Sequence, residues 1–201
     1  MLVVAVVGAL ITTLIGLRYA GEREASAVDT VIEDVLVGAV GSGDLAWLLV
    51  MPSEPQVVLP LAALLATVCL VQRRWRGAAF AAAAPLLAVA LNTWVLKPAF
   101  GRLAEGHLAY PSGHTVSIVA VSAVLVLLAR PGVARWVAAV VGAAVSLGVG
   151  VALVTLDFHY PTDVLGGIAF ALTVVPLVAL ALRRFGSEVG TRDSEGAIHA
   201  D

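Results

Sequence analysis

Long apolar runs separated by short polar segments dominate the hydrophobic pattern of this chain. A transmembrane helix needs about 20 consecutive apolar residues, and six stretches approach that length. They cover residues 1–17, 57–71, 77–96, 115–129, 136–156 and 164–182. The second run is short, but its flanking residues can extend it. The pattern predicts an all-α fold, an integral membrane helical bundle with six transmembrane helices.

The first apolar run has a second interpretation, a cleavable signal peptide. Signal peptides begin with basic residues and end in a small-residue cleavage site. Residues 1–17 have no positively charged start, and Ala20-Gly21 matches a cleavage site poorly. We therefore expect this run to remain as the first transmembrane helix.

Two polar segments lie outside the apolar runs. Residues 18–56 carry seven acidic side chains, while Val31, Val35, Leu36 and Val40 recur at a loosely helical spacing. Both an interfacial helix and a plain solvated loop fit this pattern. Residues 186–201 are predicted to form a disordered polar tail. Residues 1–185 then form a single membrane domain.

Basic residues gather on one side of the predicted bundle. They follow the second, fourth and sixth spans, as Arg73, Arg74 and Arg76, then Arg130 and Arg135, then Arg183 and Arg184. The positive-inside rule assigns that side to the cytoplasm. Both termini and the tail are then cytoplasmic in a multi-pass protein of the cell membrane. Residues 18–56 and the connections between spans three and four and spans five and six face outside.

Composition agrees with a bilayer environment and excludes other classes of protein. The chain is 60% hydrophobic and 13% charged, whereas soluble domains are about 25% charged. The net charge is -2 and no dense basic cluster is present, so no nucleic acid partner is expected. Cys69 is the single cysteine. It excludes an intrachain disulfide and is expected to pack inside a helix.

Ionisable residues collect in the two short outer connections. The first carries Lys97, Arg102, His107 and the run Tyr110-Pro111-Ser112-Gly113-His114, and the second carries Asp157, His159 and Asp163. Ionisable groups at membrane depth are functional candidates. Cations at helix ends also reach toward lipid head groups, so Lys97 and Arg102 have that simpler interpretation as well.

Two short motifs in these connections favour phosphate chemistry. Ser112 can cap the helix that follows, Gly113 allows close backbone approach, and free amides at a helix start bind anions. Asp163 is four residues from His159 and can fix its tautomer, which leaves the other ring nitrogen as a nucleophile. A simple capped turn and an interfacial histidine are the respective alternatives.

Together these groups provide what phosphoryl transfer through a phosphohistidine requires. Cations and amides stabilise charged oxygens, one histidine attacks phosphorus, and another protonates the leaving oxygen. The inventory needs neither a metal nor another cofactor. A metal site is the competing chemistry, since histidines and aspartates are ligands, but Lys97 and Arg102 oppose a cation in the same pocket.

These motifs resemble the type 2 phosphatidic acid phosphatase (PAP2) superfamily. The similarity covers about residues 57–182, which include five of the six spans. It implies a six-helix core that removes phosphate from lipid phosphates or diphosphates without metal. It also implies His159 as nucleophile, Asp163 as its partner and His114 as the acid on the leaving group. The implied phosphate-binding residues are Lys97, Arg102, Ser112 and Gly113.

The sequence departs from the family pattern at two places. The Arg-Pro pair of the first motif is replaced by Ala104 and Glu105, and the Ser-Arg pair of the third motif by Ala152 and Leu153. Two phosphate-binding arginines are therefore absent. We expect a lipid phosphate phosphatase that acts at the outer face on lipids of the surrounding membrane. The alternative is a catalytically weakened relative that binds anionic lipid or scaffolds a membrane complex. A transporter would need polar residues at the bilayer midplane, and spans four to six have almost none.

Overall fold

A computed structural model describes residues 1–104 and 106–198, with side chains described as far as residue 182. The fold is all-α apart from one two-residue ladder, as predicted. The elements in chain order are α1 (Leu2–Arg18), α2 (Ala27–Val40), α3 (Asp44–Val50), a 3-10 turn η1 (Met51–Ser53), α4 (Pro55–Val71), α5 (Trp75–Leu91), a π-helical turn η2 (Asn92–Leu96), α6 (Lys97–Phe100), β1 (Leu103–Ala104), β2 (His107–Leu108), α7 (Gly113–Leu128), α8 (Val133–Thr155) and α9 (Pro161–Ile198).

Each predicted apolar run corresponds to one helix. Among the described residues, four helical segments are long and apolar enough to cross a membrane, namely Asp44–Val71, Trp75–Phe100, Val133–Thr155 and Pro161–Leu182. The short second run is indeed extended, because α3 and η1 continue into α4. The helices α1 and α7 are apolar but shorter, with 17 and 16 residues. The chain is a multi-pass membrane protein, and the count of six spans remains a prediction.

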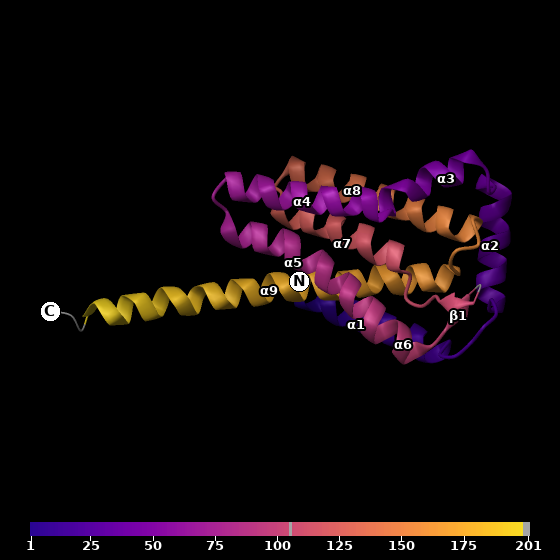
Figure 1. Ribbon diagram of the computed structural model, residues 1–201, viewed down its shortest axis with the longest axis horizontal. Helices are drawn as coiled ribbons and strands as arrows, with labels where there is room; N and C mark the ends of the chain where they lie inside the picture. Colours follow the sequence, from indigo (N-terminus) through magenta and orange to yellow (C-terminus); the bar gives the residue numbers. More distant parts are fainter. Residues whose placement is uncertain (105, 199–201) are drawn as a thin grey trace.

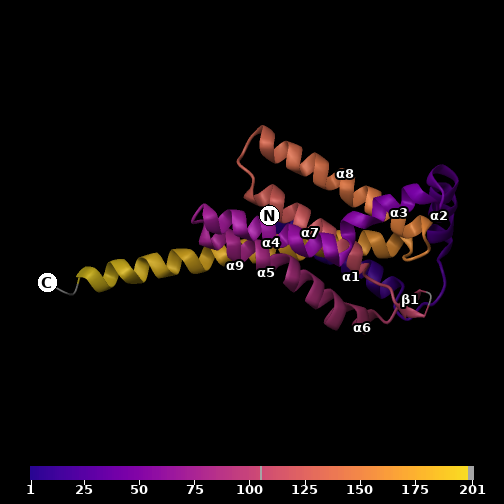
Figure 2. The same cartoon turned by 45° about the horizontal axis from the view of Figure 1, so that its top comes forward.

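The long helices run roughly along one axis, and the core lies where α5, α7 and α9 meet (Figure 1). Ala81, Ala84 and Ala88 of α5 pack there against Val116 of α7 and Val175 of α9. Small side chains on α5 allow the neighbouring backbones to come close, which is how helices associate in lipid. In Figure 2, the N-terminal end of α8 lies farther from the bundle than its C-terminal end does.

The first helix is packed tightly into this bundle against α9. Its buried face consists of small residues, including Gly8, Thr12 and Gly16. A Cβ on Gly8 would lie 2.5 Å from the carbonyl oxygen of Ala169, so only glycine allows this approach. The Tyr110 hydroxyl donates a hydrogen bond of 2.5 Å to the Thr12 carbonyl. The helix α1 is thus joined to α9 and to the loop that precedes α7.

The acidic segment contains a true helix, so the helical alternative is right and the plain loop is wrong. Ser26 and Asp29 form a capping box at the start of α2, each side chain bonding the other's backbone N–H. In Figure 1, α2 lies across one end of the bundle, nearly perpendicular to the long helices. This places its first turn beside the β1–β2 ladder and the start of α9.

The C-terminal segment differs from its sequence prediction. The disordered tail was predicted from residue 186, but α9 continues as a helix to Ile198 and projects past the bundle (Figure 1). Low hydropathy alone does not end a helix, and no proline follows Pro176. Residues 199–201 of the predicted tail lie outside the described residues.

Candidate active site

The start of α7 has the serine-capped geometry that the sequence predicts for an anion cradle. Ser112 is the N-cap residue, and its fully buried hydroxyl accepts hydrogen bonds from the N–H of Thr115 at 3.4 Å and from the Thr115 hydroxyl at 3.1 Å. The first amides of any helix lack partners within the helix. Together with the helix dipole they attract anions, and here the amides of Gly113 and His114 occupy that position.

Two glycines of α9 hold this cradle in place. A Cβ on Gly167 would lie 2.8 Å from the Ser112 carbonyl oxygen, and one on Gly166 would lie 2.3 Å from the Tyr110 ring. The Ser112 N–H also donates to the Asp163 carbonyl at 3.1 Å. The start of α7 and the start of α9 are therefore held together through backbone contacts.

The end of α8 directs the chain toward this cradle. The N–H of Asp157 donates to Val154 at 3.1 Å and that of Phe158 donates to Leu153 at 3.0 Å. With Asp157 at a φ of 58°, this is the Schellman pattern that ends many helices. The N–H of His159 also donates to the Leu153 carbonyl, at 3.2 Å. The backbone of His159 is thereby fixed to the last turn of α8.

Three histidines meet at this end of the bundle. The ring centre of His159 lies 6.3 Å from that of His114 and 6.0 Å from that of His107. On the other side of His114, its Nε2 atom lies 3.9 Å from a carboxylate oxygen of Glu54, the residue before α4. The structure thus brings the predicted nucleophile and the predicted acid together from two separate connections.

His159 is buried, and Asp163 lies beside it at an ion-pair distance. Nδ1 of His159 is 3.8 Å from Oδ2 of Asp163, which is longer than a hydrogen bond, so the predicted direct bond is not formed in this structure. Burial lowers the pKa of His159, while Asp163 opposes that shift and Lys97 adds to it. Because the pKa is lowered, the ring is neutral near neutral pH, the form in which an imidazole can attack.

Lys97 is the first residue of α6 and reaches the same region from the end of the helical segment Trp75–Phe100. The π-helical turn η2 comes immediately before it, and such turns are frequent at functional sites. The half-buried ammonium of Lys97 donates a hydrogen bond to the Leu108 carbonyl. Asn92 of the same turn is fully buried and donates to the Pro111 carbonyl at 3.3 Å. The segment carrying Lys97 is thus tied to the loop that leads into α7.

The Arg102 guanidinium bonds two carboxylates beside the site. Its side chain is fully buried, Nη1 donates to Oδ1 of Asp163 at 2.7 Å, and Nη2 donates to Oδ2 of Asp29 at 2.8 Å. The rings of Tyr19 and Tyr160 enclose the guanidinium, with their centres 4.6 and 4.7 Å away. Nε of Arg102 has no hydrogen-bond partner among the described residues, and the role of Arg102 as a phosphate binder stays a prediction.

The positions of the two absent arginines are buried and apolar. Ala104 is 3% exposed and Leu153 is fully buried in the core cluster. In the antiparallel ladder, Ala104 pairs directly with His107. Directly opposed residues of a ladder share one face, so the exposed His107 stands next to a position where the family pattern has an arginine.

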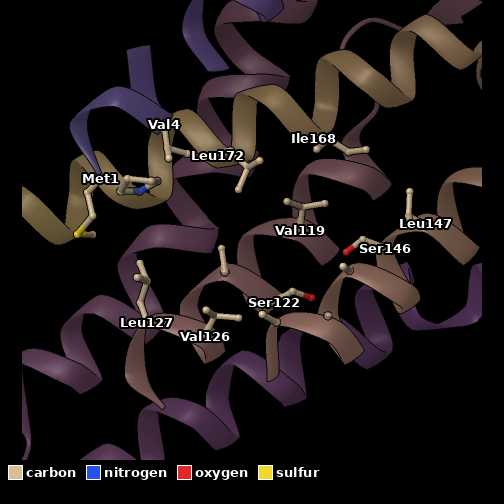
Figure 3. Close-up of a pocket in the computed structure, with 15 residues that line it drawn as sticks. Met1, Val4, Val119, Ser122, Val126, Leu127, Ser146, Leu147, Ile168 and Leu172 are labelled. Carbon is tan, nitrogen blue, oxygen red and sulfur yellow. The ribbon is translucent and has the colours of Figure 1, made fainter. Parts of the chain in front are cut away.

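A cavity lies elsewhere in the bundle. It has a volume of about 450 Å³ and lies among α1, α7, α8 and α9 (Figure 3). Its wall is carbon apart from groups such as the hydroxyls of Ser122 and Ser146, and it includes none of the predicted site residues. Apolar spaces of this kind do not hold ordered water. The histidine site is therefore a polar surface at the bundle end, separate from this cavity.

Sequence reasoning missed two carboxylates that the fold brings to the site. Glu54 precedes α4 and Asp29 lies in the first turn of α2. The Ser26-x-x-Asp29 spacing is a capping-box pattern and could have located the start of α2. Nothing in the sequence pairs Asp29 with Arg102, because 73 residues separate them.

The fold and the site define a multi-pass helical membrane protein with two histidines close together at the start of a helix. Comparison with known proteins identifies the family, because the PAP2 superfamily profile matches residues 56–186. The chain belongs to the PAP2 superfamily, which confirms the resemblance seen in its motifs. No curated protein matches it. It is similar in fold to the crystal structure of the first transmembrane PAP2 type phosphatidylglycerolphosphate phosphatase from Bacillus subtilis. The TM-score is 0.71 with 21% identity, over 92% of this chain and 96% of that one.

Proposed function

We propose that this protein is a metal-independent phosphatase for lipid phosphates or lipid diphosphates and acts through a phosphohistidine. The observation that supports this best is the pairing of a buried His159 with His114, which lies in the first turn of α7. Family membership supports the same chemistry. The similar fold is that of a phosphatidylglycerolphosphate phosphatase, so phosphatidylglycerol phosphate belongs among the substrates to test.

The first step forms a bond between His159 and phosphorus. Nδ1 of His159 faces Asp163, so Nε2 is the nitrogen that attacks. The bond between phosphorus and the leaving oxygen breaks, its electron pair stays on that oxygen, and protonated His114 gives it a proton. The carboxylate of Glu54 is the negative neighbour of this acid, 3.9 Å from Nε2 of His114. Neutral His114 then takes a proton from a water molecule, which attacks phosphorus, breaks the N–P bond and releases phosphate.

Charge on the phosphate oxygens is balanced by fewer cations than in the family pattern. Lys97 and the first amides of α7, where Ser112 and Gly113 lie, are the groups available in the described part of the chain. We assign His107 to the same task, because its ring lies 6.0 Å from that of His159 and opposite Ala104. A histidine ring at this position can donate a hydrogen bond to a phosphate oxygen.

The membrane arrangement of the proposal follows from the basic residues. Six spans place Arg73, Arg74, Arg76, Arg130 and Arg135 on the cytoplasmic side with both termini. The histidine site then faces outside, at the level of the outer head groups, and lipid reaches it from the surrounding bilayer. Water is the second substrate, and no cofactor or nucleic acid enters this mechanism.

A second candidate function is the binding of anionic lipids without turnover, and one observation favours it. Leu153 and Ala104 cannot supply the charge of the arginines that they replace. A site weakened in this way would retain anionic lipids without hydrolysing them. The two functions differ in whether phosphate is released.

The experiment is a phosphate-release assay on purified protein with a panel of lipid monophosphates and diphosphates, with and without EDTA. Release that persists in EDTA and is lost in His159→Ala is expected. The matched control is Asp34→Asn, an exposed substitution on α2, which should retain wild-type rates. Binding without release from any lipid in the panel would support the second function instead.

A further inference from the structure

A chain of charged side chains links α2 to the proposed nucleophile. Asp29 of α2 bonds Arg102, Arg102 bonds Asp163, and Asp163 lies against His159. Asp29, Arg102 and Asp163 are all fully buried. The family profile begins only at residue 56, so Asp29 lies outside the matched region and yet contacts its site.

The geometry leaves little freedom for these side chains. Nη1 of Arg102 donates to both the Thr162 hydroxyl at 2.6 Å and Asp163, while the Thr162 N–H donates to Oδ1 of Asp29 at 2.9 Å. A guanidinium presents its donors in a rigid fork. With carboxylates on two of its nitrogens, Arg102 fixes the orientation of Asp163 and joins α2 to the start of α9.

Asp29 is held in its charged form by the same contacts. Burial alone would raise its pKa, but the Thr162 N–H, the Ser26 hydroxyl and Arg102 together lower the pKa of Asp29 below its ordinary value. Burying a charge without partners is costly, so removing one member of the set leaves the others unbalanced. Two carboxylates share one guanidinium here, and each limits how strongly the other binds it.

We infer that Asp29 and Arg102 are positioning residues that hold Asp163 against His159, and that α2 is a working part of the site. This inference rests on the proposed function for its activity readout. Arg102 acts on the nucleophile through Asp163 and does not touch phosphate. Asp29 keeps Arg102 from neutralising Asp163 completely, and this leaves negative charge on the carboxylate face that meets His159.

The sign of the effect on His159 follows from the charges around it. Its neighbours are Asp163 from α9, Lys97 from α6, His114 from α7 and His107 from β2. Asp29→Asn removes a negative charge from the buried set and lets Arg102 neutralise Asp163 further. Both changes disfavour protonated His159, so its titration midpoint should move to lower pH.

The test measures Asp29→Asn, Arg102→Lys and the control Asp34→Asn. Asp29→Asn should lower kcat by about tenfold, which corresponds to about 1.4 kcal/mol of barrier, with little change in KM. Arg102→Lys keeps the charge but cannot span two carboxylates, so it should also lower kcat and spare KM. In an Asp163→Asn background, Asp29→Asn should lower kcat by no more than about a further twofold. A large rise in KM for Arg102→Lys, or fully additive losses, would overturn the inference.

A second readout does not depend on turnover. Histidine NMR signals of the purified full chain, assigned by the loss of one signal in His159→Gln, give the His159 titration directly. A midpoint at lower pH in Asp29→Asn but not in Asp34→Asn supports positioning, even if no lipid phosphate is hydrolysed. Unchanged kcat and an unchanged midpoint refute it while the proposed function stands. If Asp29→Asn does not fold, Ser26→Ala removes the hydroxyl that donates to Asp29 and also caps α2, and the same tests apply with a smaller expected shift.

Discussion

The Nη1 atom of Arg102 lies 2.7 Å from Oδ1 of Asp163, and neither side chain is exposed. This contact changes the interpretation of the motif around Lys97. An arginine in that motif would ordinarily be assigned to phosphate, but here the guanidinium belongs to an internal network of carboxylates. Lys97 and the histidines must then carry most of the substrate charge, which leads to the predictions below.

Replacing His107 tests whether it serves as a phosphate-binding residue. His107→Arg should lower KM, because an arginine at this position carries a fixed positive charge and can bond phosphate oxygens with two of its nitrogens. His107→Gln should raise KM and leave kcat nearly unchanged. The side chain is exposed, so neither change should unfold the protein. The measurement is KM of the three proteins under one condition, and identical values would contradict the assignment.

The lowered pKa of His159 predicts a loss of stability in mild acid. In the folded state the pKa of His159 is lowered from its ordinary value of 6.5. The ring therefore stays neutral at pH values where the same ring in the unfolded state already takes up a proton. The unfolded state therefore binds more protons as pH falls past 6.5, and stability decreases. Thermal unfolding in detergent between pH 7.5 and 5 should show a smaller decrease for His159→Gln than for wild type. Parallel curves would show that His159 does not contribute.

Gly166 tests the close packing that holds the helix cradle. Gly166→Ala places a Cβ within 2.3 Å of the Tyr110 ring, and overpacking of this kind costs about 1–3 kcal/mol. Activity should fall together with stability because Tyr110 lies in the loop before Ser112. The matched control is Gly38→Ala in α2, where nothing lies within 4 Å. That change should be neutral or stabilising, and equal effects at the two positions would refute the packing argument.

Cysteine labelling tests the membrane orientation. After Cys69→Ala, a cysteine at Gly43 should react with an impermeant thiol reagent in intact cells, and one at Val133 should not. Both positions are exposed, so access depends on the side of the membrane alone. Labelling at Val133 but not at Gly43 would reverse the orientation and move the histidine site to the cytoplasmic face.

Local patterns predicted the parts of this structure that depend on local physics. The apolar runs located the long helices because hydrophobic length is a property of contiguous sequence. The Ser112 cap was predictable because a cap bonds residues two or three positions away. The pairing of His159 with Asp163 was predictable in position, since four residues make one helical turn, although its 3.8 Å separation was not.

What the sequence did not reveal depends on contacts between distant segments. The assignment of Arg102 to phosphate rested on its distance from Lys97 along the chain, whereas its hydrogen-bond partners come from α2 and α9. Likewise, Glu54 meets His114 only because α4 and α7 begin at the same end of the bundle. The ladder that places His107 opposite Ala104 is two residues long on each strand. This is too short to produce a recognisable alternation of apolar and polar residues in the sequence.

The leaving-group dependence of His114→Ala separates the proposed acid from the nucleophile. A nucleophile is needed for every substrate, but an acid is needed only when the leaving oxygen is strongly basic. His114→Ala should therefore slow an alkyl lipid phosphate severely and an aryl phosphate far less, whereas His159→Ala should abolish both. Equal losses on the two substrates in His114→Ala would contradict the assigned role.

Trapping of a phosphohistidine tests the central claim most directly. Wild-type protein is mixed with a lipid phosphate labelled on phosphorus, quenched within the first turnover, and analysed for acid-labile phosphate on the protein. We expect labelled wild type, no label in His159→Ala, slower labelling in His114→Ala with an alkyl leaving group, and no effect of EDTA. Phosphate release without any label on His159, or release that stops in EDTA and returns with a divalent ion, would contradict it.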